Sequence, residues 1–252
     1  MKLEYEDLLS GDLIPVEGVG YLKPPRLKDL WPAGGIGIWK YNFFLNILAW
    51  GKEKFLEYMK LTSPRQAEIL SRNKELNVFD VMTLIPGFRP ALTETLAFFM
   101  SGSVAWDDAL RVFSVTDFKG VPTGNIDRDN FDGVRDAVLQ LNYINLGDSA
   151  ALKHTSKKTK DLWERAQASL KKESLKSPEN KSLSLGNIIS KLCAAPGGYT
   201  LLNIYDLTVF QLYDQFFQYG YLRASNLNEM AFSNHGGEKF NFQDWLKPIF
   251  KT

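Results

Sequence analysis

Two helical patterns near the C-terminus, separated by the breaker Pro196-Gly197-Gly198, constrain this chain more than any other feature. The first covers residues 185–195, and the second is predicted to run from Leu207 to Tyr219. In the second, apolar side chains recur at the spacing of one helix face: Val209, Leu212, Tyr213, Phe216 and Phe217. Because this stripe consists of aromatic and aliphatic groups and not of ionisable ones, it indicates packing or partner binding before catalysis.

Aromatic residues continue past the second helix toward the C-terminus. A stripe at helical spacing is more often core than interface, but the additional residues exceed what such a short segment can easily bury by itself: Tyr219, Tyr221, Phe232, Phe240, Phe242, Trp245 and Phe250. We therefore expect a protein partner or self-association. The candidate contact residues are Tyr213, Phe216, Phe217, Tyr219, Tyr221 and Trp245.

The rest of the chain alternates helical patterns with short β-rich segments. With 44% hydrophobic and 13% aromatic residues, it has ample apolar surface for a core. A short acidic helix precedes a hairpin about Glu17-Gly18, and a second hairpin follows Ser103, with a third strand over 120–126. Further helices are predicted over 27–31, 39–50, 53–61, 63–73, 79–85, 91–100 and 130–142. The predicted fold class is α+β, predominantly α-helical, with short β-hairpins in the N-terminal part and a C-terminal helical subdomain.

Composition divides the chain into three parts. Residues 1–148 are predicted to form a mixed helical domain with short hairpins, and residues 185–252 an aromatic-rich helical subdomain. Between them, residues 149–184 hold many lysines and few large apolar groups, which indicates an exposed helix about 160–172 and then a hinge rich in Ser, Pro and Lys. In the first domain, the helix over 39–50 is apolar almost all round and is expected to be buried on most faces.

The charge balance bears on nucleic-acid and membrane binding. Thirty basic residues stand against 29 acidic ones, so the chain has no overall field of the kind that holds a protein on nucleic acid or on an anionic membrane. The lysines of 153–181, with Trp163 as a stacking surface, could still contact phosphates locally. A solvated linker with interspersed acids explains the segment as well, and we favour that interpretation over nucleic-acid binding.

The N-terminal residues and the cysteine usage indicate an intracellular protein. Glu4, Glu6 and Asp7 interrupt any apolar run at the start of the chain, which argues against a signal peptide. The most apolar run, 41–50, is far shorter than the roughly 20 residues that a membrane span requires. Cys193 cannot form an internal disulfide, and its apolar neighbours predict a small buried hydrophobe in a reducing compartment.

An acidic segment between Asn125 and Asp136 is the best metal candidate, with Asp127 and Asp129 as the candidate ligands. Alternating oxygen ligands followed by a carboxylate are typical of a calcium loop. The segment lacks the mid-loop glycine, has an acid where an apolar residue is expected and ends in Asp and not in Glu. A turn followed by a helix N-cap at Asp129 or Asn130 is therefore the favoured interpretation.

The usual constellations of catalytic residues are missing from the sequence. Two histidines, His154 and His235, accompany the single cysteine, so the common zinc ligand sets cannot be completed. No Gly-x-Ser-x-Gly elbow is present, and Gly34-Gly35-Ile36-Gly37 lacks the Lys-Ser/Thr pair of a phosphate loop. We expect no enzymatic activity, no catalytic residue and no cofactor.

Three aromatic-containing motifs together resemble proteins from the tail modules of phages that infect Gram-positive bacteria. They cover residues 18–28, 125–135 and 203–216. The relatives are described as tail assembly chaperones, and the similarity runs over most of the chain. None of the three motifs carries catalytic chemistry.

The resemblance implies a non-enzymatic tail morphogenesis factor. Such a protein would bind the tape measure protein, or another tail protein, through aromatic and apolar surfaces and keep it soluble until tube subunits polymerise around it. It would need no cofactor or membrane and would act in the cytoplasm of the bacterial host or stay in the virion. Two alternatives remain open: a minor structural virion protein of the tail or connector, and a nucleic-acid-binding phage accessory protein that uses residues 153–181.

Overall fold

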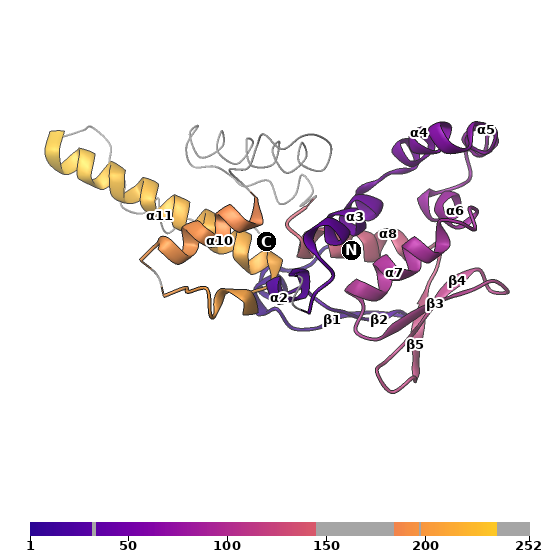
Figure 1. The fold of residues 1–252 in the computed structure, drawn as a ribbon, viewed down its shortest axis with the longest axis horizontal. Helices are drawn as coiled ribbons and strands as arrows, with labels where there is room; N and C mark the ends of the chain where they lie inside the picture. The colour runs from indigo at the N-terminus through magenta and orange to yellow at the C-terminus, as the bar shows by residue number, and fades with distance from the viewer. Residues whose placement is uncertain (32–33, 145–183, 197, 236–252) are drawn as a thin grey trace.

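Helices dominate the structure, and two small antiparallel sheets lie in its N-terminal half (Figure 1). The computed structural model describes residues 1–31, 34–144, 184–196 and 198–235. Trp245 and the Lys-rich segment up to residue 183, with its predicted helix and hinge, therefore lie outside the described residues. The predicted α+β class is confirmed.

The helices form where periodic apolar residues follow a cap or a proline. Pro64 opens one helix at its first position, and Asn77 caps another by accepting from the Asp80 amide. The helices before the second sheet are α1 Tyr5–Ser10, α2 Leu27–Leu30, α3 Ile38–Ala49, α4 Lys52–Thr62, α5 Pro64–Arg72, α6 Val78–Thr83 and α7 Arg89–Phe99. After it come α8 Phe131–Leu141, α10 Leu185–Ala194, the 3-10 turn η3 Ile204–Asp206 and α11 Val209–His235.

The first hairpin turns at Glu17-Gly18, as predicted. Strand β1 (Ile14–Val16) pairs antiparallel with β2 (Gly20–Leu22), and Gly18 takes a φ of +71°, which costs glycine little. Beyond this strand pair, the Lys23 amide donates to the Phe99 carbonyl across 2.7 Å, which joins the end of β2 to the end of α7. Two prolines then follow and end the ladder, because they have no amide proton to donate.

The second sheet has the strand order β3-β4-β5 and joins the first hairpin. Its antiparallel strands β3 (Ser103–Asp107), β4 (Val112–Thr116) and β5 (Pro122–Ile126) confirm the predicted hairpin and third strand. The Asn125 amide donates to the Gly18 carbonyl across 3.0 Å. Gly124 is required beside this contact, since a Cβ there would lie 2.1 Å from the Gly18 carbonyl oxygen.

One hydrophobic core contains side chains from the N-terminal elements and from the C-terminal helices. At one end, Phe79 of α6 lies 5.3 Å from Phe131 of α8, measured between ring centroids. At the other end, Tyr143, just after α8, lies 5.2 Å from Phe210 of α11. The described parts of residues 1–148 and 185–252 are thus joined by packing as well as by the chain.

Two helices differ from their predictions. Helix α11 does not end near Tyr219 but continues to His235. Gly220 alone does not stop it, because a glycine in a helix interior costs only about 1 kcal/mol relative to alanine. Helix α3 buries its inner side but leaves Trp39, Asn42 and Phe43 exposed, so the expectation of burial on most faces is wrong for this side of the helix.

Two local predictions also need correction. Asn130 occupies the N-cap position of α8, but its side chain makes no capping hydrogen bond to the first turn. The Asp127 carboxylate instead accepts from the amides of Asp129 and Asn130. Cys193 is half-buried at the edge of the core and not fully buried.

Candidate interaction surface

Reciprocal hydrogen bonds fix the start of α11. The Thr208 hydroxyl accepts from the Gln211 amide across 3.1 Å, and the Gln211 side-chain oxygen accepts from the Thr208 amide across 2.8 Å. This is a capping box. The Val209 amide donates to the Pro25 carbonyl, and the Gln211 side-chain amide donates to the Leu9 carbonyl. The first turn of α11 is therefore held by the N-terminal segments around it.

A buried carboxylate lies one turn further along α11. Asp214 is 2% exposed, and its Oδ1 accepts from the Tyr5 hydroxyl across 3.0 Å. Burial raises the pKa of the Asp214 carboxyl above its usual range, and the hydrogen bond from Tyr5 opposes that shift. Burial also raises the pKa of Tyr5 and of Tyr143, and the charge of Asp214 adds to both shifts. The pair links α1 to α11 near the point where α11 leaves the core.

Three of the predicted contact residues pack within or against the core. Tyr213 is buried with its ring 5.6 Å from Tyr143, and Phe217 stacks on the same Tyr143 ring at 5.4 Å. Phe216 is half-buried, and the Lys191 ammonium of α10 lies 5.9 Å from its ring. These aromatics anchor the first half of α11 to the rest of the molecule.

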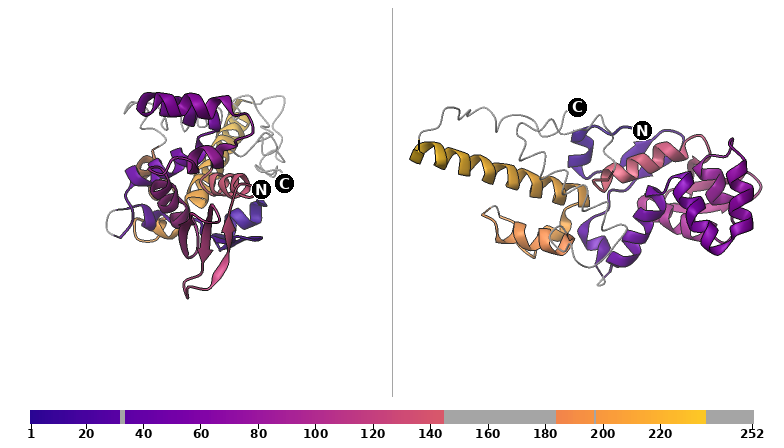
Figure 2. Two further views of the ribbon diagram at one scale, coloured as in Figure 1. Left: turned by 90° about the vertical axis from the view of Figure 1, so that its right-hand side faces the viewer. Right: turned by 90° about the horizontal axis from the view of Figure 1, so that it is seen from above.

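Two more predicted contact residues lie where α11 leaves the body. Tyr219 is half-buried against the core, and Tyr221 is partly exposed. Trp245 lies outside the described residues. Figures 1 and 2 show α11 extending from the molecule at the end opposite α4 and α5.

The second half of α11 is exposed along its apolar side. Leu227 lies about five helical turns after the buried Val209, so it continues the core-facing stripe beyond the core. Gly220 and Ala224 lie on the same face, and Met230 is an exposed neighbour. Although α11 has 27 residues, no helix among the described residues is long and apolar enough to cross a membrane. We call the face of Gly220, Ala224, Leu227 and Met230 the α11 stripe.

A second exposed aromatic surface runs along α3. Trp39 is 80% exposed, and its ring stacks on Phe43 with 6.0 Å between centroids and 5° between planes. Asn42 and Asn46 lie on the same side of the helix. Two aromatic rings next to two side-chain amides make this side of α3 suited to contact and not to core packing.

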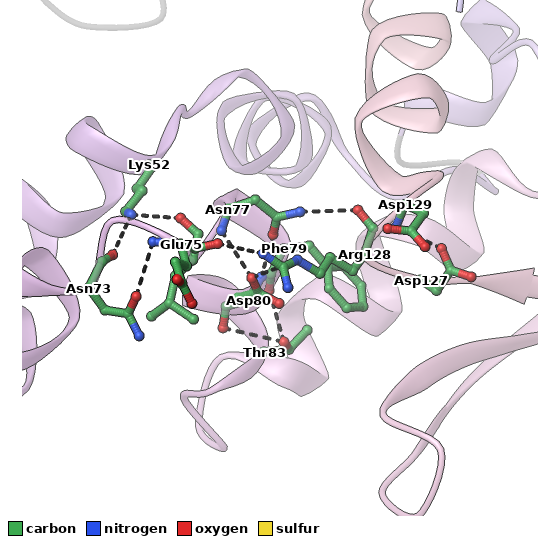
Figure 3. Close-up of polar contacts among 11 residues, drawn as sticks. Lys52, Asn73, Glu75, Asn77, Phe79, Asp80, Thr83, Asp127, Arg128 and Asp129 are labelled. Carbon is green, nitrogen blue, oxygen red and sulfur yellow. Dashed lines mark hydrogen bonds and ion pairs between the residues drawn. The ribbon is translucent and has the colours of Figure 1, made fainter.

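The candidate metal ligands Asp127 and Asp129 belong to a turn (Figure 3). The Asp127 carboxylate accepts from the Asp129 amide across 2.8 Å and from the Asn130 amide across 3.1 Å. The Asn130 side chain in turn accepts from the Asp127 amide. No group of three or more His, Cys, Asp or Glu side chains within the described ranges is arranged to hold a metal ion. In the structure this segment therefore serves as the turn before α8.

Arg128 connects this turn to the loop before α6 (Figure 3). Its Nε lies 3.2 Å from Asp80 Oδ2, its guanidinium donates to the Glu75 carbonyl, and its own carbonyl accepts from the Asn77 side chain. Lys52 of α4 donates to the carbonyl of Asn73 in the same loop. These contacts hold α4, α6 and α8 in a fixed arrangement. The polar side chains around Arg128 therefore have a structural role.

The α11 stripe is the candidate contact surface that sequence analysis missed. The predicted helix ended at Tyr219, before Leu222, Leu227 and Met230. Continuing the helical period past Gly220 would have placed Leu227 on the face of Val209. The sequence indicates the exposure of Trp39 less clearly. The sign is that Asn42 and Asn46 recur at helical spacing within an apolar run, which marks a polar side of this helix.

Comparison with known protein families gives a match in the C-terminal part of the chain. Residues 176–250 match the model of a family described as the YomV second domain, which is of a phage or prophage type. The matched range includes α10, α11 and all the candidate contact residues. It associates the C-terminal part of the chain with phage proteins. No curated protein and no solved structure matches the chain.

Proposed function

We propose that this chain is a non-enzymatic phage tail morphogenesis factor, an assembly chaperone that binds the tape measure protein through apolar and aromatic surfaces. The observation that carries the proposal is the form of α11. Its first half is fixed in the core by Thr208, Asp214 and Phe217, while its second half carries the α11 stripe into solvent. A helix that is anchored at one end and carries exposed apolar side chains at the other is suited to pair with a helix of another protein.

The size of the stripe fits a client that must be released. Fully burying one leucine or methionine side chain contributes about 1.5–3 kcal/mol. Leu227 and Met230 are the large side chains of the α11 stripe, so the binding free energy that it supplies is modest. The exposed pair Trp39 and Phe43 offers a further aromatic contact. Reversible binding of this kind suits a factor that keeps a helical client soluble and later gives it up.

The phage setting has two supports. Residues 176–250 match a phage-type family, and motifs in three parts of the chain resemble tail-module proteins. In this setting the protein acts in the cytoplasm of the bacterial host and needs no cofactor or membrane. A minor structural virion protein would use the same surfaces but remain in finished particles. The nucleic-acid alternative rests on residues 153–181, and no described residue favours it.

Co-expression with the tape measure protein tests the proposal. The tagged chain is used for affinity pull-down, and both the complex and purified particles are then analysed by mass spectrometry. Recovery of the tape measure protein, with the chain missing from particles, would support the chaperone. Presence of the chain in particles would make it a structural component. Binding to neither would refute the tail-assembly proposal.

A further inference from the structure

One aspartate holds the loop between β4 and β5 in a defined conformation. The Asp117 carboxylate accepts from the Lys119 amide across 2.8 Å and from the Val121 amide across 2.9 Å. The Asp117 backbone closes the same loop, because its amide donates to the Val121 carbonyl and its carbonyl accepts from the Gly120 amide. Gly120 takes a φ of +79°, which residues with a side chain rarely adopt. Residues 117–121 therefore form a preorganised tip.

Apolar side chains occupy the apex of this tip. Phe118 is 83% exposed, and Val121 is also exposed. The Lys119 ammonium lies 5.5 Å from the centre of the Phe118 ring. In Figure 1 the end of the sheet at β5 lies on the opposite side of the molecule from α4 and α5 and reaches away from the helices. The Phe118 ring does not stabilise the fold, because an apolar side chain contributes to stability only when it is buried.

The charges of the tip narrow the class of partner. Lys119 is exposed at the apex, whereas Asp117 is half-buried and its Oδ1 accepts from two amides of the loop, so the ammonium is the more accessible charge of the tip. Binding to nucleic acid or to an anionic membrane calls for a cluster of basic groups, and Gly120, Val121 and Pro122 beside Lys119 add none. An apolar pocket with a carboxylate at its rim complements the ring and the ammonium together.

We propose that Phe118 anchors a second protein-binding site, in which the β4–β5 tip enters an apolar pocket, bordered by an acidic side chain, on a partner protein. Aromatic anchors in such pockets carry much of the binding energy of an interface. Because Asp117 already orders the loop, the partner need not do so on binding. The site is formed by the sheet and not by α11, and it rests on the function proposed above only for the choice of tail proteins as candidate partners.

A photo-crosslinker at the apex tests this site in the full-length chain. p-Benzoylphenylalanine replaces Phe118 in one version and Leu202 in the control, because Leu202 is 93% exposed at a different turn. Each version is co-expressed with the tail proteins of the same phage and irradiated, and the adducts are identified by mass spectrometry. We expect one tail protein to be linked from position 118 and not from position 202, through a peptide that lines an apolar pocket.

Variants then measure the contact with that purified protein. Phe118→Ala should weaken binding about tenfold or more, without changing the fold because the ring is exposed. Asp117→Ala keeps the ring but frees the loop, and should weaken binding about three- to tenfold. Lys119→Glu should also weaken binding, and its effect should be largest at low salt, where charges are least screened.

Four outcomes would overturn the proposal. Adducts from position 118 could be no more frequent than those from position 202, or could form only between copies of this chain. Phe118→Ala could bind as tightly as the unaltered protein. Finally, the chain could sediment with phosphatidylglycerol vesicles in a manner that depends on Phe118, which would assign the tip to a membrane surface instead.

Discussion

The Tyr5 hydroxyl donates a hydrogen bond to the Asp214 carboxylate across 3.0 Å and joins α1 to α11, 209 positions away. Burial disfavours the charged form of Asp214, and the bond from Tyr5 favours it. The Tyr5 ring also lies 6.3 Å from Phe210, edge to face. One contact thus combines a polar link with packing at the point where α11 leaves the core.

Removing the Tyr5 hydroxyl should destabilise the protein while the ring still packs on Phe210. We expect Tyr5→Phe to lower the free energy of unfolding by about 1.5–3 kcal/mol, the range for hydrogen bonds to charged groups. Urea unfolding followed by tryptophan fluorescence measures this. Tyr58→Phe is the control, because Tyr58 is exposed on α4 and its change should stay within about 0.5 kcal/mol. Equal losses in the two variants would contradict a special role for Tyr5.

The raised pKa of Asp214 predicts a pH dependence of stability with a defined sign. Because burial raises the pKa of Asp214, its carboxyl stays protonated up to a higher pH in the folded protein than in the unfolded chain. An aspartate in an unfolded chain has a pKa of about 3.9. Between the two pKa values the folded state binds more protons, so the contribution of Asp214 to stability falls as the pH rises through that window.

Asp214→Asn removes this titration and keeps an oxygen that can accept from Tyr5. The stability of the variant relative to the unaltered protein should therefore increase as the pH rises from about 4, and level off above the raised pKa. Urea unfolding at a series of pH values tests the prediction. A difference that stays constant with pH would show that Asp214 has the same pKa in both states.

Asn77 holds both the start of α6 and the turn before α8 (Figure 3). Its side-chain oxygen accepts from the Asp80 amide across 2.9 Å, and its side-chain nitrogen donates to the Arg128 carbonyl across 3.1 Å. Asn77→Ala should cost about 1–2 kcal/mol of stability in thermal or urea unfolding, since a capping bond and a bond across the loops are lost together. Asn42→Ala on the exposed side of α3 is the control, and it should leave the stability nearly unchanged or raise it slightly. If Asn42→Ala lost as much stability as Asn77→Ala, the lost capping bond could not be the cause.

Local signals in the sequence accounted for most of the elements. The helix predicted over 63–73, the turn at Glu17-Gly18 and the hairpin after Ser103 are features that the structure confirms. Each depends on the conformational preferences of a few adjacent residues. The predicted helix ended at Tyr219, just before Gly220, although one glycine opposes a long helix only weakly.

Contacts between distant segments could not be predicted in this way. Nothing local to Phe217 indicates that it stacks on Tyr143, and nothing local to Tyr5 indicates Asp214. The predicted contact residues therefore combined core anchors such as Tyr213 with residues near the surface such as Tyr221. Helical spacing identifies the face of a helix but not the point along it where the core ends.

Leu227 provides the sharpest test of the α11 stripe, because Leu222 on the same helix is its matched control. Leu227 is 59% exposed and Leu222 48% exposed, so an aspartate at either position should leave the unfolding free energy nearly unchanged. The two side chains point about 140° apart around the helix axis, and only Leu227 continues the face of Val209.

If the stripe binds the tape measure protein, Leu227→Asp should weaken binding about tenfold or more, which is the effect expected from removing one buried leucine. Leu222→Asp should bind nearly as well as the unaltered chain. Isothermal titration calorimetry with the purified tape measure protein, or quantitative pull-down, measures both. Equal losses would mean that binding follows the general apolarity of α11 and not one face. Unchanged binding in both variants would place the contact on another surface, of which Trp39 and Phe43 are the next to test.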